Sequence, residues 1–353
     1  MRHLRFLHTA CSTFLTPPKW GARHAGVIAV GLTSTTLSSN GFAAPDQTPF
    51  TVSNQNPLVA LYGLPQAQSG EIQKPNTWRT GISYQIINTS TDSSIGGELP
   101  ESIELDGETQ RAALNLSYGL APRVDLTINI PTVRHSGGHT DGFIDDWHSF
   151  FGLPDGNRNE LEENQLRYRY ERNGEVLLDF SEDQSGTGDI SLSLGFALQQ
   201  DHHSGTSLRL GVKSSTGDIE RLTGSDSVDT ALSLHYYNRA ISQHLGFEAS
   251  IGGVVFGDAE LLEDIREDHA FFGSNTLYWQ LNPSVQLKLQ LDWHTALYDS
   301  ELEEIGDNSA QLVLGGAINL NRDTQLEIFV TEDIAVNTAP DVVFGLALKA
   351  RTP

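Results

Sequence analysis

The chain has 353 residues, and its 22 basic and 45 acidic side chains give a formal net charge of −23 at pH 7. Such an acidic surplus argues against nucleic-acid binding and against a basic lipid-binding face. No run of about 20 apolar residues is present, which excludes a transmembrane helix. A membrane protein built from strands hides its apolar residues in alternation, so its mean hydropathy still resembles that of a soluble protein.

Residues 1–43 have the features of a secretory signal peptide. Basic residues precede the apolar run Ala25–Leu32, which is too short to span a bilayer. Small residues end the segment Gly41–Ala43, so we expect cleavage near Ala43/Ala44. Loss of this leader removes Cys11, the only cysteine, and four basic residues, which leaves a mature net charge of −27. We therefore expect an exported protein without disulfides that is stabilised by strand closure.

Residues 44–75 precede the first predicted strand and are interpreted as a periplasmic N-terminal segment, and residues 76–353 as the barrel. The stretch Gln110–Val133 shows the repeating unit, which is two strands of alternating apolar and polar residues around the short turn Gly119–Arg123. Alternation with period two gives each strand one apolar and one polar face. The predicted strands are 77–88, 110–118, 124–133, 188–199, 207–215, 227–237, 245–256, 271–281, 285–294, 309–320, 324–333 and 341–351.

This pattern predicts an all-β fold, a transmembrane up-and-down antiparallel β-barrel of about 12 strands. Strands of about ten residues suit a tilted membrane crossing, which a soluble sandwich of hairpins does not require. Short turns alternate with long acidic loops along the whole chain. We expect both termini and the short turns in the periplasm, the long loops outside, and the protein in the outer membrane of a Gram-negative cell.

One short helix is predicted in the loop after strand three, from Asp141 to Leu153. Asp141 can cap it, apolar residues recur at three- and four-residue spacing, and Gly152 and Pro154 end it. Its apolar face can rest on the barrel mouth, fold into the lumen or meet outer-leaflet lipid. Packing for stability is the plainer interpretation, and a constriction or ligand contact is the sharper one. The residues assigned to the constriction are Asp145, Asp146, Trp147, His148, Phe150 and Phe151.

The loops suggest the surroundings of the protein. Thr89–Glu108 is predicted to be an acidic loop with six carboxylates and no base, and divalent cations can bridge such loops to lipid phosphate. The expected partners are outer-membrane lipid and lipopolysaccharide, bridged by such cations, and the barrel assembly machinery. Asn173-Gly174 predicts a tight hairpin. The arginines near it, Arg167, Arg169 and Arg172, are interpreted as neutralising the surrounding carboxylates.

The inward positions of the predicted strands carry charges of both signs in nearly equal number. They permit two interpretations, a lumen crossed by ion pairs or a polar pore. Twelve strands lie between the eight that side chains can fill and the sixteen or more of open porins, so strand number does not decide. The predicted lumen-lining residues are Arg79, Arg111, Asp125, Asp189, Arg209, Lys213, Asp229, Glu248, Lys288, Asp292 and Glu327.

Two patterns raise the question of chemistry. Histidines and carboxylates gather in His135–His148, but their spacing matches no closed metal site, so we assign no metal and no cofactor. His202-His203-Ser204 is similar to the His-x-Ser spacing of outer-membrane lipases, but it falls in a turn expected in the periplasm. We therefore assign no catalytic residues.

Four stretches are familiar in combination: NQNPL with YGLP in Asn54–Pro65, Phe143–Arg158, Ser185–Phe196 and Val212–Asp229. Together they resemble a family of Gram-negative outer-membrane β-barrel proteins, the domain of unknown function numbered 3187. The likeness spans nearly the whole mature chain. It implies an outer-membrane barrel without a settled activity, so it transfers no catalytic residues.

The function expected from the sequence is a narrow passive channel for a small solute, and not an enzyme. The first alternative is a sealed barrel with a structural or surface-interaction role. An outer-membrane lipid hydrolase is a more distant alternative, and it would need a hydrogen-bonded His and Ser at the outer rim.

Overall fold

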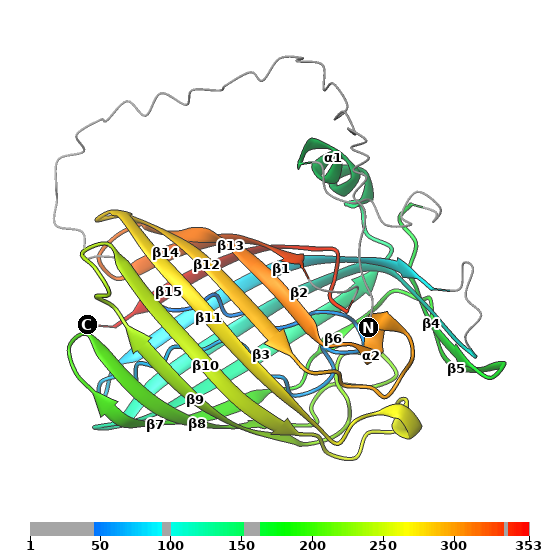
Figure 1. Cartoon of the computed structure of the whole chain (residues 1–353), viewed down its shortest axis with the longest axis horizontal. Coiled ribbons are helices and arrows are strands. Elements are labelled where there is room, and N and C mark those ends of the chain that lie inside the picture. Colours follow the sequence, from blue (N-terminus) through cyan, green and yellow to red (C-terminus); the bar gives the residue numbers. More distant parts are fainter. Residues whose placement is uncertain (1–45, 94–99, 152–162, 335–337, 353) are drawn as a thin grey trace, which may run out of the picture. The chain divides into compact units, whose positions relative to one another are not determined.

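The structure, a computed structural model, describes residues 46–93, 100–151, 163–334 and 338–352. Twelve of the strands in this part of the chain form the barrel wall: β1 (Trp78–Asp92), β2 (Glu101–Ala121), β3 (Val124–Ser136), β7 (Ser191–Gln200), β8 (Ser204–Lys213), β9 (Asp229–Asn238), β10 (Leu245–Val255), β11 (His269–Asn282), β12 (Val285–His294), β13 (Ser309–Asn319), β14 (Thr324–Asp333) and β15 (Val342–Arg351). Neighbours pair antiparallel, and the pairing of β1 with β15 closes the ring (Figure 1). The predicted 12-stranded up-and-down barrel is confirmed.

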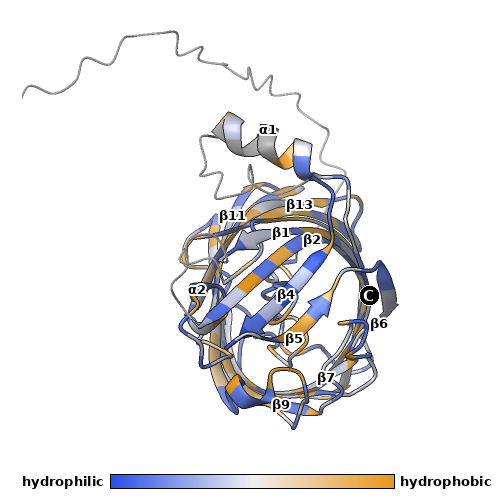
Figure 2. Ribbon diagram, turned by 90° about the vertical axis from the view of Figure 1, so that its right-hand side faces the viewer, coloured by the Kyte–Doolittle hydropathy of each residue, from blue (hydrophilic) through white to orange (hydrophobic). Residues whose placement is uncertain are grey.

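The outer face of the barrel is apolar. On β9 every second residue is buried, and the intervening Leu232 and Leu234 are 51% and 43% exposed. Leu346 and Leu348 repeat the pattern on β15. The strands in Figure 2 accordingly alternate between apolar and polar residues. This is the alternation that a lipid-facing barrel requires.

The connections alternate in length around the barrel. Short turns such as those between β2 and β3 or between β11 and β12 lie at the end that carries the C-terminus, here called the turn end (Figure 1). The long connections lie at the opposite end, here called the loop end. No helix in the described part of the chain is long and apolar enough to cross a membrane.

The first long connection is mostly strand, which corrects the prediction of an acidic loop over Thr89–Glu108. β1 and β2 remain paired beyond the barrel rim, from Asn88↔Glu108 to Asp92↔Glu104. The prediction was wrong because it gave more weight to the clustered carboxylates than to the alternating β-branched residues, which continue into this stretch. Only residues within 93–100 connect the two strands.

The first residues of β2, Glu101–Asp106, lie beyond the barrel rim and pair with β4 (Arg167–Arg172) instead of β3. β4 in turn pairs with β5 (Glu175–Phe180). This hairpin lies across the barrel mouth (Figure 2). Asn173 and Gly174 form its tight turn with φ of +52° and +80°, as predicted. Beside it, β6 (Gln184–Thr187) pairs with the end of β3.

The arginines of this hairpin neutralise carboxylates, which confirms the interpretation of the sequence. Arg172 Nε lies 3.1 Å from Glu101 Oε1, and Arg167 Nη1 lies 3.2 Å from Asp179 Oδ1. Arg169 pairs with Glu171 on its own strand at 2.8 Å.

Among the described residues, three short helices lie at the loop end: α1 (Asp141–Phe151), η2 (Glu263–Ile265) and α2 (Glu303–Gly306). α1 begins at Asp141, as predicted, and lies outside the ring of strands (Figure 2). Asn88 Nδ2 of β1 donates a hydrogen bond to Asp141 Oδ1 at 2.8 Å. The Phe143 ring packs on Phe344, which lies on the outer face of β15, with 5.5 Å between ring centroids.

Candidate functional site

The N-terminal segment, residues 46–75, lies inside the barrel. It contacts inward side chains of β3, β8–β10 and β12–β15, and crosses the interior in both directions before β1 begins (Figure 1). The sequence interpretation had this segment in the periplasm, and the structure corrects it. The physical reason is that the segment supplies hydrogen-bond partners to buried polar groups of the wall, which would otherwise carry a desolvation cost.

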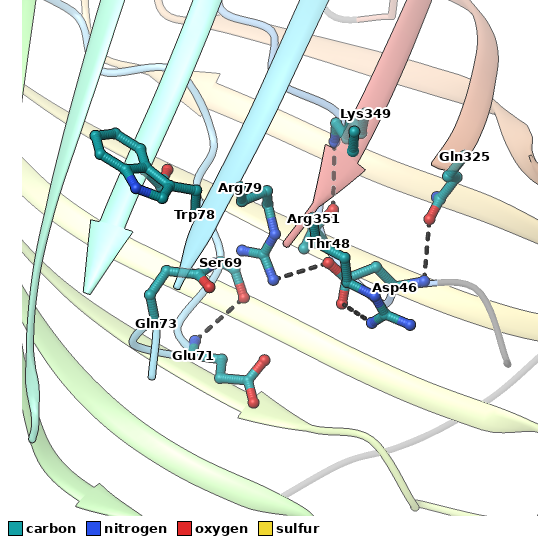
Figure 3. A network of polar contacts seen from close by, with 12 residues as sticks. Asp46, Thr48, Ser69, Glu71, Gln73, Trp78, Arg79, Gln325, Lys349 and Arg351 are labelled. Atoms are coloured by element: carbon teal, nitrogen blue, oxygen red, sulfur yellow. Dashed lines mark hydrogen bonds and ion pairs between the residues drawn. The ribbon is translucent and has the colours of Figure 1, made fainter. Parts of the chain in front are cut away.

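The segment is anchored at the turn end by ion pairs, shown in Figure 3. Arg79 Nη2 of β1 lies 2.8 Å from Asp46 Oδ2, and Arg351 Nη1 of β15 lies 3.9 Å from Asp46 Oδ1. The Asp46 amide donates to Gln325 Oε1 at 3.0 Å, and Lys349 Nζ donates to Thr48 Oγ1 at 3.2 Å. These contacts fix the beginning of the segment to the strands that close the barrel.

Burial raises the pKa of Asp46, but Arg79, Arg239, Arg351 and Lys349 lower it more, to about 2. Since this pKa lies below the ordinary aspartate value of 3.8, Asp46 stabilises the folded state above about pH 4 and loses that contribution as the pH falls towards 2. We expect Asp46→Asn to lower the unfolding free energy by about 2 kcal/mol at pH 6 and to have almost no effect near pH 2. Urea titrations in detergent micelles measure this difference.

Asp323→Asn is the control, because Asp323 lies in an exposed turn at the same end of the barrel. A loss of stability in Asp46→Asn that stays equal at both pH values would contradict the anchoring role.

Beyond the anchor, the segment runs along the wall formed by β12–β14. Lys288 Nζ donates to the Thr48 carbonyl at 2.7 Å. Gln290 exchanges two hydrogen bonds with the Phe50 backbone, at 2.8 and 3.2 Å, as a neighbouring strand would. The Phe50 ring packs on Phe329 with centroids 4.9 Å apart. The segment therefore covers the inner face of this part of the wall.

The segment reverses at Asn54–Leu58. Asn54 Oδ1 accepts from the Asn56 amide at 2.8 Å, and Asn56 Oδ1 accepts from the Leu58 amide at 3.0 Å, which are two successive Asx turns. Asn54 Nδ2 also lies 2.9 Å from His294 Nε2 on β12. The NQNPL motif is thus a reversal held against the wall.

A hydrophobic cluster, here called the loop-end cluster, covers this reversal. Leu58 and Tyr62 are buried in it, and Tyr298 Oη donates to the Leu58 carbonyl at 2.9 Å. Its buried members are Leu58, Val59, Leu61, Tyr62, Ile103, Leu105, Leu166, Tyr168, Tyr170, Phe180, Leu222, Ala231, Val254, Phe256, Ala259, Leu262, Ile265, Ala270, Phe272, Leu297, Tyr298, Leu302 and Ile305. The long connections therefore share one core with the N-terminal segment.

The segment then returns to the turn end along β8–β10. The Gly63 amide donates to Asp229 Oδ2 at 2.8 Å, and Arg209 donates to the Ser69 carbonyl at 2.9 and 3.1 Å. Glu248 accepts from Ser69 Oγ at 3.0 Å and from the Gly70 amide at 3.1 Å. Buried charges of the wall are here satisfied by backbone groups of the segment.

The predicted lumen-lining residues all lie inside the barrel, where most of them form ion pairs. Arg209 pairs with Asp125 at 3.0 Å, and Lys288 pairs with Glu327 at 2.6 Å. Lys213 lies 2.6 Å from Asp189 and 3.2 Å from Asp229. The residues that also border an internal cavity are Arg79, Arg111, Asp125, Asp189, Arg209, Lys213, Asp229 and Asp292. Most inward charges thus form ion pairs, as the first interpretation predicts. Several of them also border a cavity, which the second interpretation requires.

This cavity of about 220 Å³ lies between the N-terminal segment and the wall. On β2 and β3 it is lined by inward side chains that remain half-buried, here called the polar ladder: Arg111, Asn115, Ser117, Thr127 and Asn129. Arg111 Nη2 donates to Asn129 Oδ1 at 3.1 Å, and Asn129 Nδ2 donates to Asn115 Oδ1 at 2.8 Å. Ser117 and Thr127 share a hydrogen bond at 2.9 Å. The ladder bonds largely within itself and offers its remaining polar atoms to the cavity.

The residues assigned to a constriction lie on α1. Asp146 is exposed, and Phe150 is 82% exposed. The side chains of Asp145, Trp147, His148 and Phe151 lie outside the described part of the structure. The described residues that line the cavity come from the N-terminal segment, the strands and their connections, so a constriction by α1 stays a prediction.

The remaining sequence candidates do not form a reaction centre among the described residues. His135 points inward, with its Nδ1 2.8 Å from Thr109 Oγ1, whereas Asp141 lies on the outer side, and no group of three metal-ligating side chains is found there. Ser204 begins β8 next to an exposed turn at the turn end, and it donates to Asp201 Oδ2 at 3.1 Å. A buried Ser–His contact, Ser233 Oγ to His235 Nε2 at 2.8 Å, lies under the N-terminal segment and not at the loop end.

The chain is similar to several solved structures of outer-membrane proteins. The COG4313 outer membrane channel from Pseudomonas putida F1 matches with a TM-score of 0.53 and 12% identity, over 80% of this chain and 98% of that chain. The KdgM porin (TM-score 0.40, 7% identity, 76% and 98% coverage) and the CymD monoaromatic hydrocarbon channel (0.38, 9%, 89% and 96%) are less similar. At these identities the first likeness shows the fold alone, and the other two support no argument. No curated protein matches the sequence.

The sequence also matches the family described as "Protein of unknown function (DUF3187)" over residues 27–352. The match begins before the described residues and includes the whole N-terminal segment and all strands of the barrel wall. The resemblance inferred from the four motifs is thereby confirmed, and the outer-membrane barrel fold agrees with it. The chain belongs to the DUF3187 family.

Proposed function

We propose that this protein is a narrow passive channel for a small polar solute, which passes between the N-terminal segment and the wall formed by β2 and β3. The observation that carries the proposal is the cavity of about 220 Å³ beside the polar ladder. A polar lining of this kind replaces part of the hydration of a solute, as pore linings do. The proposal assigns no chemical reaction to the protein.

The two sides of the lumen differ in a way that supports this route. On the β12–β14 side, Lys288 and Gln290 are buried and bound to the N-terminal segment. On the β2–β3 side, Asn115 and Asn129 remain half-buried and face the cavity. A solute that follows the ladder therefore leaves the contacts of Lys288 and Gln290 with the segment in place.

The second candidate, a sealed structural or surface-interaction barrel, is favoured by the loop-end cluster. The cluster buries Leu58 and Tyr62 of the segment beneath the long connections, and the β4–β5 hairpin lies across the mouth. A channel with such a cap must be narrow. The two candidates thus differ in whether the cavity connects to both ends of the barrel.

Single-channel recording of the mature protein in planar bilayers tests the proposal. We expect a small conductance, which Asn115→Trp reduces at least about fivefold because the indole fills the route beside the ladder. The matched control is Leu114→Trp, which places the same ring on the lipid-facing side of β2, where Leu114 is 37% exposed. A silent wild-type protein, or equal effects of both variants, would favour the sealed barrel.

A further inference from the structure

Arg111 differs from the other cations that line the cavity. Arg79 pairs with Asp46, Arg209 with Asp125, Lys213 with Asp189 and Asp229, and Lys349 with Glu327. Among the described residues, Arg111 is the one arginine or lysine of the cavity lining that forms no ion pair with a carboxylate. A charge at a half-buried site normally acquires a partner, since desolvation without one is costly.

The acceptors around Arg111 are neutral amides. Its Nη2 donates to Asn129 Oδ1 at 3.1 Å. In the amide orientation that satisfies both side chains, the oxygen of Gln66 on the N-terminal segment accepts from Nη1 at 3.0 Å and from Nη2 at 3.2 Å. These contacts hold the guanidinium in place without neutralising it, and they leave part of its five N–H donors for another acceptor.

The residue next to Arg111 on β1, Gln85, has no hydrogen-bond partner for its side chain among the described residues. Gln85 lies directly opposite Arg111 in the β1–β2 ladder, on the same face of the sheet. Its side chain is fully buried, and neither polar atom of its amide has a hydrogen-bond partner in the described part of the structure. A buried amide without partners beside an uncompensated guanidinium is an arrangement that an added acceptor would stabilise.

We propose that Arg111 forms a binding site for the carboxylate group of a small organic anion inside the lumen. The proposal rests on the proposed channel function and names the class of solute. A planar guanidinium binds a carboxylate through two parallel hydrogen bonds, which inorganic halides cannot accept in the same way. The cavity of about 220 Å³ is below the usual size of drug-sized pockets, about 300–1,000 Å³, and therefore suits a small acid.

One negative group of the lining opposes this preference. Asp292 on β12 also lies outside the ion pairs of the described residues, but it is 9% exposed and accepts from Gln290 Nε2 at 2.8 Å. The ring order β2-β1-β15-β14-β13-β12 separates it from Arg111 by four strands. The anion site is therefore local to the polar ladder.

The test compares variants of Arg111 in planar bilayers. In a potassium chloride gradient, we expect Arg111→Gln to lower the ratio of anion to cation permeability about three- to tenfold, as expected for loss of one charge at the pore wall in low salt. Arg111→Lys should keep this ratio. Arg134→Gln is the matched control, because it removes the same charge on the outer side of β3, where Arg134 is 55% exposed.

The carboxylate is probed with millimolar propionate at constant chloride. Propionate should reduce the chloride current of the wild type, reduce that of Arg111→Lys more weakly because the planar fork is lost, and leave that of Arg111→Gln unchanged. A conducting wild type without a propionate effect, or an equal effect in Arg111→Gln, would overturn the carboxylate site and leave the channel intact. An electrically silent wild type would overturn the channel and the site together. Heat-modifiability on gels verifies that each variant is a folded barrel.

Discussion

A chain of residues 44–353 that lacks residues 46–68 is expected to conduct at least about five times more current than residues 44–353 complete. The deleted residues fill the β12–β14 side of the lumen, where Phe50 and the Thr48 carbonyl meet Gln290 and Lys288. Side chains fill an eight-stranded barrel but not a wider one, so twelve strands enclose open space when no additional chain fills it. Single-channel recording measures the effect.

The control replaces residues 51–66 by a Gly-Ser repeat of equal length, which keeps a chain inside the barrel but removes Leu58 and Tyr62 from the loop-end cluster. We expect this variant to give intermediate conductance with frequent fluctuations. Deletion of residues 142–153 tests the other prediction, that α1 narrows the lumen. If that deletion raises conductance and the loss of 46–68 does not, then the constriction lies at α1 and not at the N-terminal segment.

A large loss of stability is expected when Glu327 is replaced, because its carboxylate pairs with two lysines inside the barrel. Its carboxylate lies 2.6 Å from Lys288 Nζ and 2.9 Å from Lys349 Nζ, and Glu327 and Lys288 are completely buried. Glu327→Leu leaves both cations without a counter-charge, and removal of one partner of a buried pair costs roughly 3–5 kcal/mol. The free energy of unfolding in urea measures this loss.

The double variant Lys288→Met with Glu327→Leu should recover the part of the stability that is lost through the unpaired, completely buried Lys288, because a neutral apolar pair replaces these two ions. Lys288→Met alone should cost less than Glu327→Leu, since Glu327 keeps Lys349 as a partner. A loss below 1 kcal/mol in Glu327→Leu would mean that water reaches this site and that the N-terminal segment does not exclude it.

The barrel itself could be predicted from the sequence because the residues that specify each strand and each turn lie close together in the chain. Each strand carries its own period-two pattern, as in Val228–Tyr236, and each turn carries its own signal, as in Asn282-Pro283-Ser284. The extensions of β1 and β2 beyond the rim were not predicted, because their carboxylates suggested a solvent-exposed loop. Their partners, the arginines of β4, come from about 65 residues further along the chain.

The position of the N-terminal segment could not be predicted, because its stabilising contacts lie far away in sequence. Asp46 binds Gln325, Thr48 binds Lys288, and Asn54 binds His294, across separations of 240 to 279 residues. The segment has no regular periodicity, so its sequence alone resembles a linker. The signal that was present is the set of inward charges: their near balance indicated ion pairs, and buried groups such as Glu248 and Gln290 required further partners from somewhere in the chain.

The loop-end cluster has a consequence for how the protein surface can change over evolutionary time. Surface loops of barrels usually tolerate substitution, insertion and deletion because little packs against them. Here Leu262, Ile265, Leu297 and Leu302 are core residues although they lie in connections. Mutational tolerance at this end is therefore confined to the exposed acidic positions between them. A phage or an antibody reaches only these exposed positions on the folded protein, so it meets the part of this end that can change without loss of the fold.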